Sequence, residues 1–118
     1  IYLLKTLFIL ATKIFCKLQG RGYRWGVAYQ FSKNWQDATL WRSKKITNPK
    51  NRFLADPFVI KYKDAHFCFV EDLDFKSNKG SISVYKITSS GYESMGVVLK
   101  EDFHLSFPYI FKYKNEIF

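Results

Sequence analysis

The feature that most constrains the fold of this chain is an internal repeat. Residues 53–67 (FLADPFVIKYKDAHF) align without a gap to residues 104–118 (HLSFPYIFKYKNEIF), 51 positions later, with six identities in 15 columns. In each copy an apolar run, a short polar turn and a second apolar run predict a β-hairpin. The identical pairs are Leu54/Leu105, Pro57/Pro108, Lys61/Lys112, Tyr62/Tyr113, Lys63/Lys114 and Phe67/Phe118.

The residues between the two copies continue this pattern. We expect strands over residues 56–62, 65–71, 81–87 and 92–99, joined by two tight turns and by a polar loop over 72–79. Four short strands in roughly 50 residues, linked by hairpins, are typical of one β-propeller blade, which must stack on neighbouring blades to bury its faces. The sequence therefore predicts an all-β fold, a propeller fragment of about one and a half four-stranded antiparallel blades. Two unrelated hairpins in a sandwich are the alternative.

Two regions are expected along the chain. An N-terminal helix and linker take residues 1–20, and a partial propeller takes residues 21–118, comprising a lead-in strand around Trp25, a blade over 53–103 and the start of the next blade at 104–118. Residues 31–51 are polar and rich in turns. The repeat columns at Leu54, Pro57, Val59 and Tyr62 are expected to be architectural. The 118 residues suit one small domain. We expect the chain to be a piece of a longer protein, because it begins with Ile rather than Met and ends within an apolar strand pattern.

The first 18 residues predict an amphipathic helix. Apolar residues recur at helical spacing, whereas Lys5, Lys13 and Lys17 lie away from the centre of the apolar stripe. The lysines interrupt the run that a membrane span requires, and no signal peptide is clear, so we expect no transmembrane span. Two interpretations stay open, a helix packed on a neighbouring domain and a helix lying on a membrane surface. The glycines at 20 and 22 are expected to end the helix.

Charge and cysteine content limit which classes of partner and cofactor are expected. The formal net charge of +9 favours acidic partners in general, although a merely solvated surface explains it equally well. The lysines are scattered and the aromatic residues alternate into a core, so we expect no nucleic acid as a partner. Cys16 and Cys68 lack metal-ligand spacing and are expected to be reduced, which fits a cytoplasmic protein. No metal site, phosphate loop or cofactor is predicted.

One column of the repeat breaks the match. Asp56 stands where the second copy has Phe107, in an apolar setting that makes an idle charge costly. Its position at the start of an innermost blade strand predicts that it faces the central channel, and a turn-capping aspartate is the alternative. Glu71 closes an apolar strand and is either functional or a solvated strand end. His104 is either a ligand-binding residue or a core or rim histidine.

These residues carry a resemblance to a known family. From about Trp25 to its end, the chain resembles the N-terminal region of glucosamine inositolphosphorylceramide transferases and their bacterial relatives. The motifs that carry it, in chain order, are RFLADPF (52–58), FVE (69–71), GSI (80–82), Val98-Leu99 and HLSFP (104–108). More distantly the region is similar to the five-bladed propeller of furanosidase-type glycoside hydrolases, such as arabinanases, xylosidases and invertases.

Five residues are candidates for the site. The resemblance implies that Asp56 is a general base or nucleophile, and Glu71, a charge that closes an apolar strand, is a second catalytic candidate that the resemblance does not itself assign. Arg52, His104 and Ser106 are the residues implied for substrate binding. Glycoside hydrolysis needs at least two carboxylates that flank the bond, and in the hydrolases the other acids lie on later blades.

The function expected from the sequence follows from these assignments. We expect a carbohydrate-active propeller domain of a glycan- or glycolipid-metabolising protein, either glycosyltransferase-associated or glycosidase-like, with Asp56 at its central sugar site. Whether it turns over substrate stays open, and the alternative is a non-catalytic scaffold that binds a glycan or a protein. The expected partners are a sugar or glycolipid, anionic forms included, and a neighbouring catalytic module, for instance a formyltransferase-like one, joined through the N-terminal helix.

Overall fold

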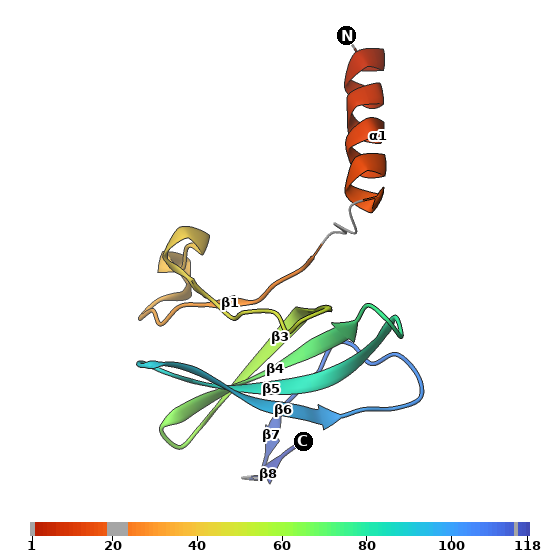
Figure 1. Ribbon diagram of the computed structural model, residues 1–118. Coiled ribbons are helices and arrows are strands. Elements are labelled where there is room, and N and C mark those ends of the chain that lie inside the picture. The colour runs from red at the N-terminus through yellow and green to blue at the C-terminus, as the bar shows by residue number, and fades with distance from the viewer. Residues whose placement is uncertain (1, 19–23, 115) are drawn as a thin grey trace.

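The computed structural model describes residues 2–18, 24–114 and 116–118. One N-terminal helix, α1 (Tyr2–Leu18), precedes a region built mostly of strands (Figure 1). The predicted helix and the mostly β composition are both confirmed. Ile1, the glycines expected to end the helix and Tyr23 of the lead-in strand lie outside the described residues.

A four-stranded antiparallel sheet forms the centre of the fold. Its strands are β3 (Arg52–Tyr62), β4 (Ala65–Asp74), β5 (Lys79–Thr88) and β6 (Gly91–Leu99), which pair in chain order (Figure 1). The predicted number, order and antiparallel pairing of these strands are confirmed. The expected polar loop over 72–79 is shorter than predicted, because β4 continues to Asp74 and β5 already begins at Lys79.

β3 is longer at its start than the sequence pattern indicated. The pairing of β3 with β4 shifts between Ala55 and Phe58, so Asp56 and Pro57 form a bulge. Proline lacks the N–H that a ladder needs, and a bulge is one of the few places where a strand accepts it. The strand therefore runs through the Asp-Pro pair that we had taken as its beginning.

The lead-in strand is shorter than predicted. Only Ala28–Tyr29 (β1) pairs, with Lys44–Lys45 (β2), and two short 3₁₀ helices, Trp35–Asp37 and Leu40–Arg42, lie between them. The Trp25 carbonyl accepts a hydrogen bond from the Asn48 side chain at 2.8 Å instead of a ladder bond. An asparagine side chain thus replaces a partner strand at this position.

The core lies between the central sheet and the segment that carries β1 and β2. Its buried residues are Val27, Ile46, Leu54, Cys68, Val70, Tyr85 and Ile87. Both cysteines are free, and burial raises the pKa of the Cys68 thiol to about 11. Cys68 is therefore a protonated packing residue at neutral pH.

Three of the four columns expected to be architectural are not buried. Leu54 is fully buried, but Pro57 is exposed, and the exposed fractions of Val59 and Tyr62 are 52% and 46%. β3 is the edge strand of its sheet within the described residues, so side chains near its free edge have fewer neighbours. Within the described residues, Pro57, Val59 and Tyr62 are therefore not core positions, and their architectural role stays a prediction.

The second copy of the repeat forms a small hairpin. β7 (Lys112–Tyr113) pairs with β8 (Glu116–Ile117), and Phe111 and Phe118 exchange two backbone hydrogen bonds of 2.9 Å. It contacts the first sheet directly. The Leu105 amide donates to the Gly80 carbonyl at 3.0 Å, and the Phe58 and Tyr109 rings, which share a repeat column, lie 5.2 Å apart.

Candidate functional site

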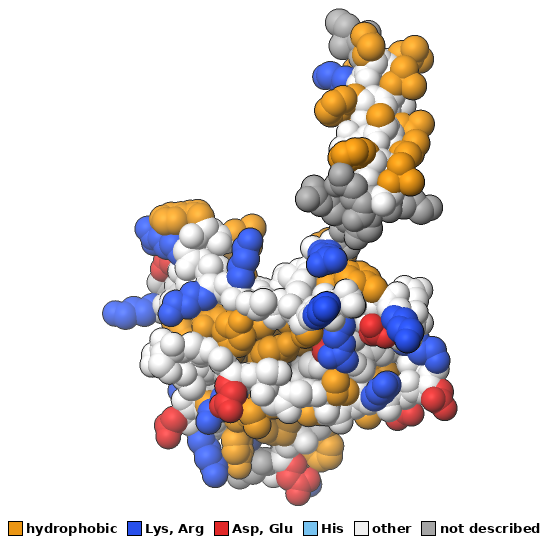
Figure 2. Space-filling view, viewed as in Figure 1, with side chains coloured by type: hydrophobic (Ala, Val, Ile, Leu, Met, Phe, Trp, Pro, Cys, Tyr) orange, Lys and Arg blue, Asp and Glu red, His pale blue; other side chains and the backbone are white. Residues whose placement is uncertain are grey.

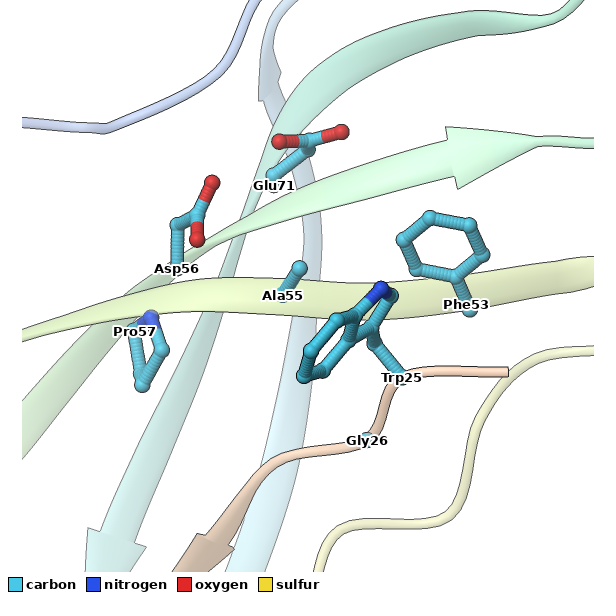
Figure 3. A pocket seen from close by; sticks show the side chains of 7 residues that line it. All are labelled: Trp25, Gly26, Phe53, Ala55, Asp56, Pro57 and Glu71. Carbon is cyan, nitrogen blue, oxygen red and sulfur yellow. The ribbon is translucent and has the colours of Figure 1, made fainter. Parts of the chain in front are cut away.

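A pocket of about 440 Å³ lies at the edge of β3. Figure 3 shows the Asp56 and Glu71 carboxyl groups on one side of it, with the Trp25 and Phe53 rings beside them. Backbone around Gly26, Ala55 and Pro57 completes the lining. The pocket thus combines apolar rings with two acids, the combination expected of a small-ligand site.

The bulge in β3 brings the two acids together. Ala55 is paired with Glu71 across the β3–β4 ladder, and Asp56 follows with a positive φ of 46°. Aspartate tolerates this left-handed conformation better than most residues. The half-buried Asp56 side chain therefore lies next to Glu71 instead of on the opposite face of the strand, where regular alternation would place it.

The environment of Glu71 changes its acidity. Glu71 is 6% exposed. Burial is the main cause that raises its pKa, and a hydrogen bond with the Asp56 side chain and the Asp56 charge add to it, while the His104 charge opposes the rise. The raised pKa means that Glu71 releases its proton at a higher pH than an exposed glutamate does.

His104 also contacts Glu71. Its Nε2 lies 3.4 Å from Glu71 Oε1, and its Nδ1 accepts a hydrogen bond from the Gly80 amide at 3.0 Å. Because Nδ1 is an acceptor, the neutral ring carries its proton on Nε2, which faces the carboxyl group. The second copy of the repeat thus supplies a residue that orients an acid of the first sheet.

Gly80 permits this contact because it has no side chain. A Cβ at this position would lie 2.2 Å from the Leu105 carbonyl oxygen, and 3.2 Å from both His104 Cε1 and Glu71 Cγ. Atoms at the first distance overlap, and the obstructing atom is backbone. A glycine is therefore required for the second copy to dock beside Glu71.

Arg52 lies away from the pocket. Its guanidinium pairs with Asp72 at 3.2 Å, and Ser83 donates a hydrogen bond of 2.7 Å to the same carboxylate oxygen. Asp72 follows Glu71 in β4, so the two side chains leave opposite faces of the sheet. The pairing with Arg52 offsets the cost of burying the Asp72 carboxylate. Its other oxygen, Oδ1, has no hydrogen-bond partner in the described part of the chain.

The proposed substrate residues thus differ in their surroundings. His104 contacts Glu71, Arg52 is engaged with Asp72, and the half-buried Ser106 is not among the residues that line the pocket. Their assignment to substrate binding stays a prediction, as do the catalytic assignments of Asp56 and Glu71.

Two pocket residues were not singled out as site residues from the sequence. Trp25 was interpreted as part of a lead-in strand, and Phe53 as an apolar neighbour of Asp56. Both side chains line the pocket, and the Trp25 side chain is 68% exposed. An aromatic residue next to a glycine, Trp25-Gly26, was the signal in the sequence that such a lining residue was present.

Two further findings concern metals and membranes. Within residues 2–18, 24–114 and 116–118, no group of three or more His, Cys, Asp or Glu residues is arranged to hold a metal ion. No helix in that same part of the chain has the length and hydrophobicity that a membrane crossing requires.

Comparison with known proteins identifies the family. The protein-family model described as "Glucosamine inositolphosphorylceramide transferase 1, N-terminal" matches residues 38–118 of this chain. The chain is similar to the protein of that name from rice (Oryza sativa subsp. indica), with 40% identity over 72 residues, 59% of this chain and 10% of the relative. It is also similar to that of Arabidopsis thaliana, with 32% identity over 97 residues, 67% of this chain and 13% of the relative.

These matches cover a small part of the relatives. The chain spans about a tenth of the length of the curated relatives it matches. No solved structure matches it significantly. The resemblance seen in the sequence motifs is confirmed, and the chain belongs to the family of glucosamine inositolphosphorylceramide transferase N-terminal regions.

Proposed function

We propose that this chain is the sugar-recognising part of a glycolipid-modifying transferase, and that the pocket at Asp56 and Glu71 binds an amino sugar. The single observation that carries the proposal is the hydrogen-bonded acid pair beside two aromatic rings at the edge of β3. The name of the relatives, which refers to glucosamine and to a glycolipid, supports the substrate class.

The proposed fold around the site is a propeller, with β3 to β6 as one blade and residues 104–118 as the start of the next. The backbone supports this repeat, because positive φ angles recur in equivalent columns. They are 46° and 52° at Asp56 and Phe107, and 52° and 44° at Lys63 and Lys114. The contact between Phe58 and Tyr109 supports side-by-side packing of the two copies.

In such a propeller the pocket faces the common axis. β3 is then the innermost strand of its blade, and the preceding segment with Trp25 lies against it. The domain division at residues 20 and 21 and the five-bladed ring belong to the same proposal. A structure of a longer chain that places residues 104–118 in a sheet apart from β3 to β6 would reject it.

The charge of the acid pair selects the ligand. Two acidic side chains make the pocket an anionic site, which suits the ammonium group of an amino sugar. The faces of Trp25 and Phe53 offer apolar surface to the C–H groups of a pyranose ring. A neutral sugar would use the same rings but would lose the charge-assisted hydrogen bond.

The acid pair favours recognition over glycoside hydrolysis. In hydrolases the two carboxyl groups stand about 5 Å or more apart, so that they can flank the glycosidic bond. Here Asp56 and Glu71 are hydrogen-bonded to each other, which leaves no space between them for a bond to be cleaved. A scaffold role without a sugar ligand remains the second candidate function.

The test compares two sugars that differ at one group. Isothermal titration of the full chain with methyl glucosaminide and with methyl glucoside is expected to give tighter binding of the amino sugar. Asp56→Asn should weaken amino-sugar binding about tenfold to a hundredfold, the value of a hydrogen bond to a charged group. It should change methyl glucoside binding much less.

The matched control is Asp64→Asn in the exposed turn between β3 and β4, which removes the same charge far from the pocket. Equal loss in both variants, or equal affinity of the wild type for the two sugars, would contradict the assignment of the pocket. The absence of binding to either sugar would favour the scaffold function.

A further inference from the structure

The surface of α1 is the largest apolar feature that the pocket leaves unexplained. Along one side of the helix, large apolar side chains recur at spacings of three and four, and every one of them is more than half exposed. They are Leu3, Leu4, Leu7, Phe8, Leu10, Ile14, Phe15 and Leu18. Soluble monomers rarely leave so continuous an apolar stripe uncovered, so a partner is required.

The opposite side of α1 carries the lysines. Lys5 and Lys13 lie on it together with Thr6, Thr12 and the exposed Ile9, and the sequence of the helix contains no acidic residue. The two threonine hydroxyls donate to backbone carbonyls one turn earlier, at 3.0 and 2.7 Å, which satisfies them within the helix. Figure 2 shows the apolar side chains along the helix and basic side chains over the visible face of the strand region.

This division of charge and apolar surface selects the partner. Helices that lie in the plane of a membrane interface combine an apolar face with a lysine-bearing polar face. Since α1 carries lysines and its sequence has no acidic residue, its charge favours an anionic partner surface.

We propose that α1 docks on the surface of a membrane that contains anionic lipids. The apolar stripe enters the boundary between headgroups and acyl chains, and Lys5 and Lys13 remain at the level of the phosphates. This goes beyond the proposed sugar site and does not depend on it. It would hold the strand region close to the headgroups of lipids.

The test measures binding to vesicles without any sugar. The full chain is expected to sediment with vesicles of equimolar phosphatidylcholine and phosphatidylglycerol, and much less with phosphatidylcholine alone. Leu7→Gln should lower the partition coefficient about tenfold, because one buried leucine is lost from the apolar stripe. Lys5→Gln with Lys13→Gln should lower it by about fivefold per lysine, and added salt should do the same.

Two matched variants control for composition. Ile9→Gln removes an equally exposed aliphatic residue from the polar side of α1 and should leave binding unchanged. Lys61→Gln with Lys63→Gln removes the same charge from the exposed end of β3 and the turn that follows it, and should also have little effect. Circular dichroism of each variant checks that the helix is retained.

Two outcomes would overturn the proposal. One is that the chain fails to bind the mixed vesicles, or that Ile9→Gln reduces binding as much as Leu7→Gln does. The other is a dimer in analytical ultracentrifugation that Leu7→Gln dissociates, with no vesicle binding, because the stripe would then be covered by a second copy of the chain.

Discussion

The two copies of the repeat share their local backbone and differ in what surrounds them. Asp56 and Phe107 both take a left-handed conformation before a proline, and Lys63 and Lys114 both take one in the turn. The first copy belongs to long strands in a four-stranded sheet, whereas the second pairs only over two-residue strands. Local sequence sets the shape of each hairpin, and neighbouring strands determine how far its pairing extends.

The largest expected difference in stability between the copies is at a repeat position where both carry leucine. Leu54 is fully buried in the core, and its counterpart Leu105 is only half-buried. Leu54→Ala should lower the free energy of unfolding by about 3 to 4 kcal/mol, because it leaves a cavity. Leu105→Ala should cost less than half of this. Urea denaturation of both variants measures the pair, and equal losses would show that the two copies are packed alike.

The contact between the second copy and β5 is tested at Gly80. Gly80→Ala should cost about 2 to 3 kcal/mol, since the new Cβ collides with the backbone of Leu105. Gly26→Ala is the control, because the nearest atom to a Cβ there lies 4.0 Å away. Thermal unfolding should separate the two variants clearly. If the two variants are equally stable, the second copy does not pack against Gly80.

At Phe107, where the second copy differs from Asp56 of the first, we expect a smaller change in the free energy of unfolding, and in the stabilising direction. Phe107 is bulky, 76% exposed and left-handed, with a φ of 52°. Phe107→Asn should stabilise the chain by about 0.5 to 1 kcal/mol, since asparagine tolerates this conformation better. Asp56→Asn should change stability little on conformational grounds. A destabilised Phe107→Asn variant in urea denaturation would mean that the Phe107 ring has a packing partner.

The smallest expected effect is a dependence of stability on pH that comes from Glu71, which lies on β4 just beyond the first copy. Because the pKa of Glu71 is raised in the folded chain, the folded state binds more protons than the unfolded state above the ordinary value of 4.5. Glu71 should therefore contribute less stability as the pH rises from 4.5 through its raised pKa. Glu71→Gln should remove this slope in a series of urea denaturation curves. An unchanged slope would assign the proton to another group.

Much of the fold could be predicted because alternation and turn residues mark the strands. The hairpin turns at Lys63-Asp64 and Ser89–Gly91 lie where the sequence indicated, between β3 and β4 and between β5 and β6. The start of β3 could not be predicted. A proline usually ends a strand, and Pro57 is accommodated here only by the register shift between β3 and β4. The length of the lead-in strand could not be predicted, since alternation over residues 24–30 does not show how many residues find a partner, and in the described residues only Ala28 and Tyr29 pair with β2.

The candidate site was predictable only in part. Asp56 and Glu71 were found because each charge interrupts an apolar run, but their mutual contact depends on the bulge. Arg52 shows the limit of a motif. The motif RFLADPF places it beside Asp56 in sequence, whereas in the structure it pairs with Asp72 on the other face of the sheet.

The burial of one thiol offers a way to observe the helix alone. At neutral pH the Cys68 sulfur is enclosed and un-ionised, while Cys16 on α1 is partly accessible. A maleimide dye should therefore attach at a single place without any engineered cysteine. Its emission would report the polarity around the helix, in solution or against vesicles, in the native chain.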